Sequence, residues 1–220
     1  MADEPALPTL GGARPSYRER VADALRAALV AGELRPGQVH SAPTLAARFG
    51  VSATPVREAL LDLVKEGLLE PVPNKGFRVT EVTGRQLDEY TQIRALIEIP
   101  TTVGLAASAD PAALEALRPV ALEIVTAAAA GDLIGYIEAD RRFHLGLLAL
   151  AGNQYLVEVV GDLRKRSRLY GLNALVEHGL LDSSAEEHLE LLDALLLRDA
   201  QLVQSIMTRH LVHVRGIWAE

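Results

Sequence analysis

Apolar residues recur at intervals of three and four along most of this 220-residue chain, which is the spacing of one face of an α-helix. In the first third of the chain, glycine and proline interrupt this pattern at points where they would end helices. Three helices are therefore predicted there, over residues 17–31, 41–49 and 54–66. Ser41 can cap the second helix, and Thr54-Pro55 gives the third a capping residue followed by proline at its first helical position.

Short apolar runs replace the helical spacing after the third predicted helix. Residues 68–72 and 77–80 are separated by Pro73-Asn74-Lys75-Gly76, a sequence typical of a tight turn. The two runs are therefore expected to pair as a β-hairpin. The order of helix, helix, turn, helix and hairpin predicts a winged helix-turn-helix over residues 16–82, preceded by a flexible tail at residues 1–15.

Leucine and alanine dominate residues 83–220, where the sequence has no convincing strand pattern. Thr83 and Gln86 have the spacing of a capping box at the start of the first helix. Pro100 and Pro119 are expected to kink or break their helices. The architecture is thus predicted to be mostly α, with an all-α bundle following the winged helix-turn-helix. About six helices are expected in the bundle, over residues 84–108, 110–130, 132–151, 153–178, 183–198 and 199–217.

Composition excludes several kinds of site. Cysteine is absent, so there are no disulfides, thiolate metal ligands or cysteine nucleophiles. No signal peptide and no apolar stretch near the ~18 residues of a membrane span occur, so a cytoplasmic protein without a membrane partner is expected. The net charge is −7, but residues 15–82 hold nine Lys/Arg and eight Asp/Glu, and the acidity lies in residues 83–220. The N-terminal part can therefore still present a basic face to nucleic acid.

The third helix is the candidate for reading DNA, because the second helix of a helix-turn-helix lays its N-terminal residues in the major groove. Arg57, one turn into this helix, can reach phosphate or guanine, and a cation at the hairpin tip can reach phosphates or a minor groove. The alternative is a structural module in which Arg57 pairs with a neighbouring carboxylate. The candidate DNA-binding residues are Arg48, Ser52, Thr54, Arg57, Lys75 and Gly76.

The run from Val51 to Leu60, with the sequence VSATPVREAL, resembles the GntR family of bacterial regulators. The resemblance covers residues 17–80 and includes Leu34-Arg35-Pro36-Gly37, Leu45-Ala46, Leu63, Glu66-Gly67-Leu68 and residues 74–79. It implies sequence-specific binding to a double-stranded DNA operator. Ala53 stands where the family usually has a basic residue, and Ala42-Pro43 replaces its usual charged pair. The operator sequence is therefore not carried over.

A second group of polar residues lies in the predicted bundle. Asp140 and His144 are spaced i, i+4 and share one helix face, while His188 and His210 lie on later helices. One carboxylate and three imidazoles suit Zn, Ni, Mn or Fe(II), and a bundle interior can bring such ligands together. The alternative is that these histidines only fill the core. His213, one turn beyond His210, is a competing ligand candidate.

Residues 84–217 resemble the FCD ligand-binding domain of the FadR-like branch of GntR regulators. The resemblance implies that Asp140, His144, His188 and His210 bind a divalent metal ion (Zn, Ni or Mn) and that a small organic acid completes its coordination. It also implies ligand-binding roles for Arg94 and Asn153, a homodimer, and most often a repressor. An intrahelical pair with Glu98 is the alternative for Arg94. The matching residues are Arg94, Glu98, Ala106-Ala107, residues 140–144, Gly152-Asn153, Glu187-His188, Asp199, Met207 and His210.

A metal-dependent hydrolase or oxygenase with a helical accessory domain is the alternative function, because an Asp/His₃ metal ion with open positions can activate water. The sequence offers no neighbouring general base, nucleophile motif, phosphate loop or dinucleotide fingerprint to accompany that chemistry. The sequence therefore favours a regulator over an enzyme.

Overall fold

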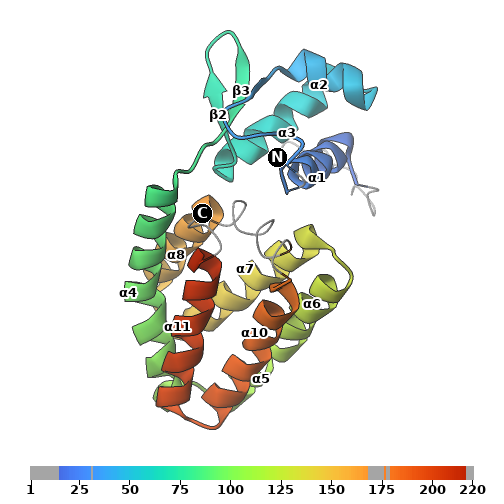
Figure 1. The fold of residues 1–220 in the computed structure, drawn as a ribbon. Helices are drawn as coiled ribbons and strands as arrows, with labels where there is room; N and C mark the ends of the chain where they lie inside the picture. Colours follow the sequence, from blue (N-terminus) through green and yellow to red (C-terminus); the bar gives the residue numbers. More distant parts are fainter. Residues whose placement is uncertain (1–14, 31, 168–175, 177–178, 217–220) are drawn as a thin grey trace, which may run out of the picture.

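The structure is a computed structural model that describes residues 15–30, 32–167, 176 and 179–216. Its buried apolar side chains form two separate clusters, one within residues 21–79 and the other within residues 105–211. Figure 1 shows a small unit of helices and a hairpin above a larger group of long helices. The predicted tail at residues 1–15 lies almost wholly outside the described residues.

The N-terminal unit holds the three predicted helices. They are α1 (Tyr17–Val30), α2 (Ala42–Phe49) and α3 (Ala53–Lys65). Ser41 caps α2 as predicted, because its hydroxyl accepts a hydrogen bond from the Thr44 N–H at 3.2 Å. The predicted cap of the third helix was wrong by two residues: Ser52, with an extended backbone, occupies the N-cap position, and Thr54 is helical. Pro55 is tolerated at the third helical position because the first N–H groups of a helix have no partner within it.

The wing is a three-stranded antiparallel sheet. Strands β2 (Leu69–Val72) and β3 (Gly76–Val79) form the predicted hairpin, and β1 (Val39–His40) pairs with the free side of β3. Strand β1 was not predicted from the sequence, because two residues are too few to show a strand pattern. His40 lies opposite Phe77, and this pairing fixes the hairpin beside the start of α2.

Gly76 is required by the contact between β3 and β1. Its φ is +129°, and a Cβ at this position would overlap the His40 carbonyl oxygen. We expect Gly76→Ala to lower the free energy of unfolding by about 2–3 kcal/mol, since backbone strain and the overlap act together. Denaturant unfolding measures this change. Gly67→Ala is the control, because Gly67 also has a positive φ but no atom within 4 Å of its Cβ position. Equal losses for the two variants would contradict the role of the His40 contact.

The C-terminal unit is a helical bundle without a strand in its described residues. Its helices are α4 (Gly84–Ser108), α5 (Pro111–Glu115), α6 (Arg118–Ala129), α7 (Leu133–Ala149), α8 (Gln154–Ser167), α10 (Leu181–Leu196) and α11 (Ala200–Gly216). The Thr83–Gln86 capping box is present at the start of α4. The predicted helix over 153–178 corresponds to α8, and most of its remainder lies outside the described residues. No described helix is long and apolar enough to span a membrane.

The two prolines of the bundle have different effects. Pro119 is the second residue of α6, and the predicted helix over 110–130 is divided just before it into α5 and α6. Pro100 was expected to kink or break its helix, but α4 continues through it for two more turns. Pro100 is exposed, so water can solvate the Leu96 carbonyl that it leaves without a helical donor.

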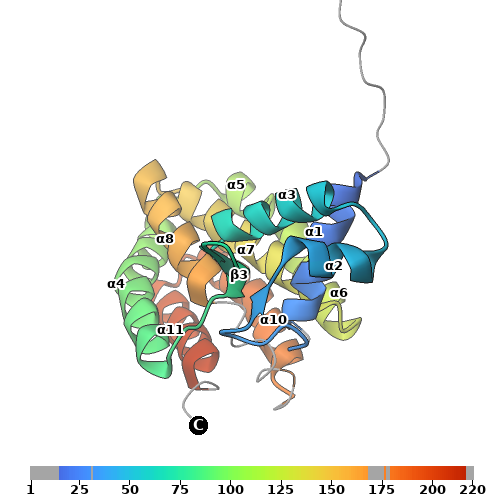
Figure 2. The same cartoon turned by 90° about the horizontal axis from the view of Figure 1, so that it is seen from above.

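Helix packing places α7 at the centre of the molecule. It packs against α6, α8 and α4 in the bundle and also contacts α1 of the N-terminal unit. Helix α4 packs along α11 and follows directly from β3 through residues 80–83. The view from above shows the N-terminal unit lying over α7 and α6 (Figure 2). Helices α4 and α7 therefore link the bundle physically to the helix-turn-helix.

Candidate DNA-binding surface and metal centre

Helix α3 has one buried face and one free face. Val56, Ala59, Leu60 and Leu63 are at most 1% exposed and hold the helix against α1 and α2. Four of the predicted DNA-binding residues lie exposed at or near the start of this helix or on the helix before it: Ser52, Thr54, Arg57 and Arg48. The buried face thus fixes α3 while the N-terminal side chains remain accessible, as a recognition helix requires.

Several cations of the N-terminal unit form ion pairs, whereas the predicted DNA-binding cations form none within the described part of the chain. Arg18 bonds Asp62 at 2.6 Å, and Arg26 bonds Glu66 at 2.6 Å. Among the residues that the structure describes, no carboxylate forms an ion pair with Arg48, Arg57 or Lys75. Free exposed cations at the helix start and the hairpin tip are available to phosphates and base edges.

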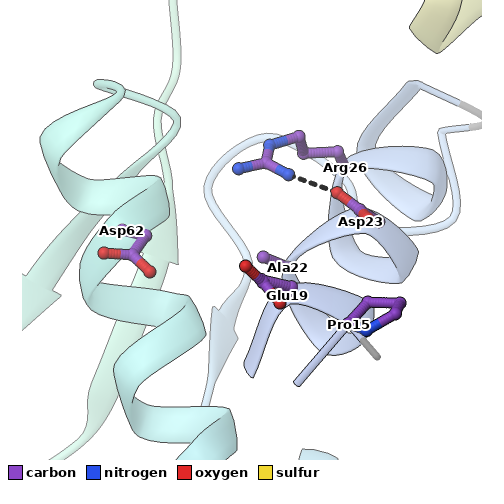
Figure 3. A pocket seen from close by; sticks show the side chains of 6 residues that line it. All are labelled: Pro15, Glu19, Ala22, Asp23, Arg26 and Asp62. Atoms are coloured by element: carbon purple, nitrogen blue, oxygen red, sulfur yellow. Dashed lines mark hydrogen bonds and ion pairs between the residues drawn. The ribbon is translucent and has the colours of Figure 1, made fainter. Parts of the chain in front are cut away.

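A hollow beside the other end of α3 is lined by charged side chains that are paired within the protein. Glu19, Asp23 and Asp62 line it together with Arg26, as Figure 3 shows. Asp62 pairs with Arg18 and Asp23 pairs with Arg26, so these arginines are less available to the DNA backbone than an unpaired cation. The charge distribution agrees with a DNA surface at the start of α3 and at the wing, where Lys75 is exposed and Gly76 is held against β1.

The four predicted metal ligands come together in the bundle. Asp140 and His144 extend from α7, His188 from α10 and His210 from α11, and their ligand atoms all lie within 4.8 Å of one another. The His144 Nε2 atom is 3.0 Å from the His188 Nε2 and 3.1 Å from the His210 Nε2. Two nitrogen ligands about 2.1 Å from one ion would be ~3.0 Å apart at the right angle of an octahedral site and ~3.4 Å apart at the tetrahedral angle. The cluster therefore has the spacing of a ligand set.

Hydrogen bonds at Nδ1, the ring nitrogen that faces away from the cluster, fix the imidazoles of His188 and His210. The His188 Nδ1 lies 3.0 Å from the Ala185 carbonyl oxygen, and the His210 Nδ1 lies 2.9 Å from the Glu187 carboxylate. Only a protonated Nδ1 can donate to these oxygens, so each neutral ring presents an unprotonated Nε2 to the cluster. Lone pairs directed at one point fit a bound cation.

Burial keeps two imidazoles of the cluster, those of His144 and His210, neutral. The pKa of His144 is held well below its usual value by burial, and also by the nearby Arg164 guanidinium and the other two rings. Burial lowers the pKa of His210 to about 4, although the Glu187 carboxylate acts in the opposite direction. Neutral imidazole is the form that binds metal, so the site is ready for a divalent ion at neutral pH.

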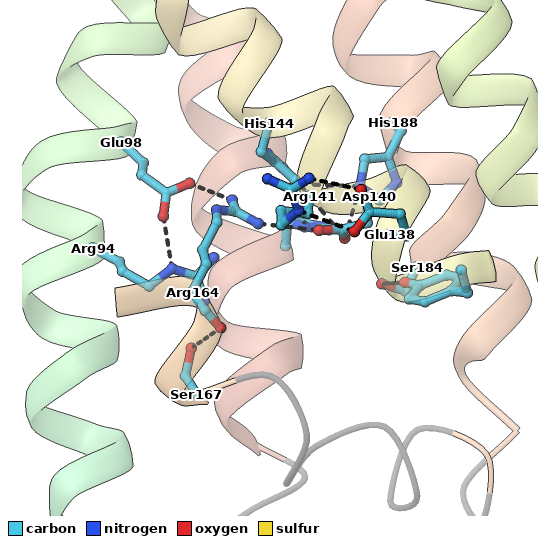
Figure 4. A network of polar contacts seen from close by, with 12 residues as sticks. Arg94, Glu98, Glu138, Asp140, Arg141, His144, Arg164, Ser167, Ser184 and His188 are labelled. Carbon is cyan, nitrogen blue, oxygen red and sulfur yellow. Dashed lines mark hydrogen bonds and ion pairs between the residues drawn. The ribbon is translucent and has the colours of Figure 1, made fainter. Parts of the chain in front are cut away.

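A buried chain of charges adjoins the cluster (Figure 4). Arg164 donates from Nη1 to the Asp140 Oδ2 at 3.2 Å and from Nη2 to Glu98. Arg94 donates from Nε to the other Glu98 oxygen at 2.6 Å. The intrahelical pair weighed for Arg94 is thus present, and Glu98 and Arg164 lie between Arg94 and Asp140 along this chain of contacts.

Asn153 lies outside this group. It is exposed before α8, where its side-chain oxygen accepts the Leu156 N–H at 3.1 Å and so caps the helix. Arg164 is about three turns further along the same helix. The structure thus brings Arg94 near the metal cluster, whereas Asn153 stays at the start of α8.

Neither Arg164 nor the orienting role of Glu187 was predicted from the sequence. Arg164 belongs to an Arg-Lys-Arg run at the end of α8, where basic residues commonly face solvent. The one available signal was spacing, because Val160, Arg164 and Ser167 recur at helical intervals on one face of α8. The structure shows that this face is buried. Glu187 precedes His188 in the sequence but contacts His210 on the neighbouring helix, which adjacency cannot reveal.

The fold joins a winged helix-turn-helix to an all-helical domain, as in DNA-binding transcriptional regulators. A model of the bacterial regulatory proteins of the gntR family matches residues 17–79, and a model of the FCD domain matches residues 89–213. The chain therefore belongs to the GntR family and carries an FCD domain.

Named relatives agree with this assignment. The chain is 33% identical to the HTH-type transcriptional regulator McbR of Escherichia coli K12 over 83% of each chain. An uncharacterized regulator from an unstable DNA locus of Streptomyces ambofaciens is 32% identical over 85% of this chain and 78% of its own. The HTH-type transcriptional repressor GlaR of E. coli is 27% identical over 84% and 87%. The solved structure of E. coli McbR matches with a TM-score of 0.68 and 30% identity, over 93% of this chain and 98% of that one.

Proposed function

We propose that this protein is a transcriptional repressor whose affinity for its operator is modulated by a small organic acid bound with a divalent metal ion in the FCD domain. The observation that carries the proposal is the meeting of Asp140, His144, His188 and His210 within 4.8 Å, from three helices, in a chain of this family. The similarity to a relative named as a repressor supports the sign of regulation.

DNA binding by a homodimer is part of the proposal. A single recognition helix reads one half-site, and two helices at a fixed separation read a palindromic operator. In each subunit Arg57, Thr54 and Ser52 at the start of α3 face the major groove, while Arg48 and Lys75 contact the backbone. Their exposure and the absence of ion pairs to Arg48, Arg57 and Lys75 among the described residues support this assignment.

The metal ion, which we expect to be Zn, Ni or Mn, suits a ligand set of nitrogen and oxygen without sulfur. When bound, it supplies positive charge in a dry interior and a coordination position for a carboxylate. It would also fix α7, α10 and α11 relative to one another, since each contributes a ligand. Arg94 is proposed to steady the organic acid, and its 2% exposure keeps it out of water.

Regulation follows if the organic acid binds one arrangement of the bundle more tightly than another and shifts the population towards it. The arrangement is transmitted to the DNA-binding unit by α4, which is joined to β3 by residues 80–83, and by α7, which contacts α1. The proposal therefore requires a change at the metal site to alter operator affinity.

We expect about one metal ion per purified chain and a fall in melting temperature when a chelator removes it. At a free metal concentration of 100 times Kd the stabilisation is about 2.7 kcal/mol, or roughly 5–10 °C for a chain of this size. Elemental analysis and thermal unfolding measure both quantities, with citrate and other small carboxylates then added to the reloaded protein. Binding to selected operator DNA is measured in parallel. A chain without metal, with a melting temperature indifferent to chelator, would contradict the sensor proposal but not the DNA-binding assignment.

A further inference from the structure

Arg164 occupies an unusual place for an arginine. Its side chain is 2% exposed, and its guanidinium lies between the carboxylates of Asp140 on α7 and Glu98 on α4. Figure 4 shows this position beside the histidines. Burying a charged group is costly unless it is paired, and both of its partners are themselves nearly inaccessible. The contact must therefore be explained by what it does for these two carboxylates.

The two oxygens of Asp140 have different surroundings. Oδ1 lies 3.3 Å from the His188 Nε2 and 3.8 Å from the His144 Nε2, whereas Oδ2 accepts the hydrogen bond from Arg164 at 3.2 Å. The hydrogen bond from Arg164 to Oδ2 restricts rotation of the Asp140 carboxylate about its Cβ–Cγ bond. Arg164 thus sets which Asp140 oxygen faces the three imidazoles.

Glu98 extends the connection to α4. It is fully buried, and its two oxygens accept from Arg164 and from Arg94. Asp140, Arg164 and Glu98 therefore join α7, α8 and α4 by side-chain contacts that exclude water. Because α4 follows directly from the wing, a displacement of Asp140 has a rigid route to the DNA-binding unit.

We propose that Arg164 is a positioning residue that holds the Asp140 carboxylate for the divalent ion and, through Glu98, ties that carboxylate to α4. This inference rests on the proposed metal site and assigns to it a residue outside the ligand set. The hydrogen bonds that orient metal ligands commonly affect affinity by 10–100-fold.

The sign of the effect distinguishes positioning from simple electrostatics. A guanidinium close to a divalent cation repels it, so loss of the charge alone would strengthen metal binding. Loss of the Asp140 orientation would instead weaken metal binding. The two explanations of Arg164 therefore predict opposite changes in the metal Kd.

The test compares metal Kd values, measured by competition with a chelator of known affinity, for three variants and the wild type. Arg164→Gln removes the contact, and Arg164→Gln/Glu98→Gln removes it while keeping the buried charges balanced, in case the single variant does not fold. Arg118→Gln is the control, because among the described residues Arg118 pairs with Glu115 and Asp193 and with neither Asp140 nor Glu98. We expect both Arg164 variants to bind metal 10–100-fold more weakly and the control to change by less than about threefold.

Hydrogen exchange of the α4 amides provides a readout that does not depend on affinity. At saturating metal, the wild type is expected to gain protection along α4, and the double variant is not. Unchanged or tighter metal binding by both Arg164 variants would overturn the positioning role, and equal protection of α4 in the double variant would overturn the tie to that helix. Absence of metal binding by the wild type would overturn the proposed metal site itself, a result distinguishable from the other two.

Discussion

His144→Ala is expected to weaken binding of the divalent ion by at least about 100-fold, because loss of a ligand should exceed the 10–100-fold effect of losing an orienting contact. His144 is the central residue of the cluster, since its Nε2 lies 3.0 and 3.1 Å from the other two imidazole nitrogens. At a metal concentration of 100 times the wild-type Kd, a 100-fold loss removes about 2.3 of the about 2.7 kcal/mol of stabilisation, and a larger loss removes more. Metal occupancy and melting temperature are therefore expected to fall together.

The measurement is the difference in melting temperature between metal-loaded and chelated protein, which cancels the cost of the cavity that alanine leaves. We expect roughly 5–10 °C for the wild type and almost none for the variant. His40→Ala is the matched control, because His40 lies in β1 of the wing, and it is expected to keep the full difference. Full metal occupancy in the His144 variant would mean that the ligand set is wrong.

Arg57→Ala is expected to weaken operator binding by 10-fold or more while leaving the fold intact. A good contact between arginine and a base is worth about 1–3 kcal/mol, and the cost to folding is small because Arg57 is exposed and forms no ion pair with the described residues. Arg57 is expected to make its contact only in the complex with DNA. The metal affinity and the melting temperature of the free protein are therefore expected to stay at wild-type values.

Fluorescence anisotropy with operator DNA, at several salt concentrations, measures this prediction and identifies the kind of contact. Loss of a phosphate contact lowers the slope of log K against log salt by about 0.9, whereas loss of a base contact leaves the slope and relaxes specificity at one position. Arg142→Ala removes the same charge from α7, where Arg142 pairs with Glu123, and serves as the control. Equal affinities for the Arg57 variant and the wild type would rule out its place in the recognition helix.

Most helices of this protein follow from the sequence, because their signals are local. The start of α4 is an example: the Thr83–Gln86 capping box predicted it, and the helix begins at Gly84 and ends at Ser108, the predicted bounds. Glycine turns and apolar spacing likewise located α1 and α2. Each of these signals involves residues within a few positions of one another, so no knowledge of the tertiary fold is needed.

Features that depend on a distant partner were missed or misplaced. Strand β1 exists because Val39 and His40 meet β3, almost 40 residues later in the chain. The continuity of α4 through Pro100 depends on which side of the helix faces solvent. Neither pairing nor exposure is encoded in the neighbouring residues alone.

The metal cluster shows the same division. The i, i+4 spacing of Asp140 and His144 placed two ligands on one face of a helix from the sequence alone. Their meeting with His188 and His210 depends on how α10 and α11 pack against each other and against α6 and α4, so the sequence alone offered it only beside the alternative of core-filling histidines.

By itself, the sequence determined the order of the elements, the mostly helical architecture and the identity of the candidate ligands, since periodicity, caps and turn residues act over short distances. The tertiary structure decided that three imidazoles from three helices face one point and that Glu187 orients His210. It also decided that Arg164, in a run of basic residues typical of a solvated helix end, is buried between two carboxylates. Burial and long-range pairing arise only when helices far apart in the chain pack together, and they give these residues their chemistry.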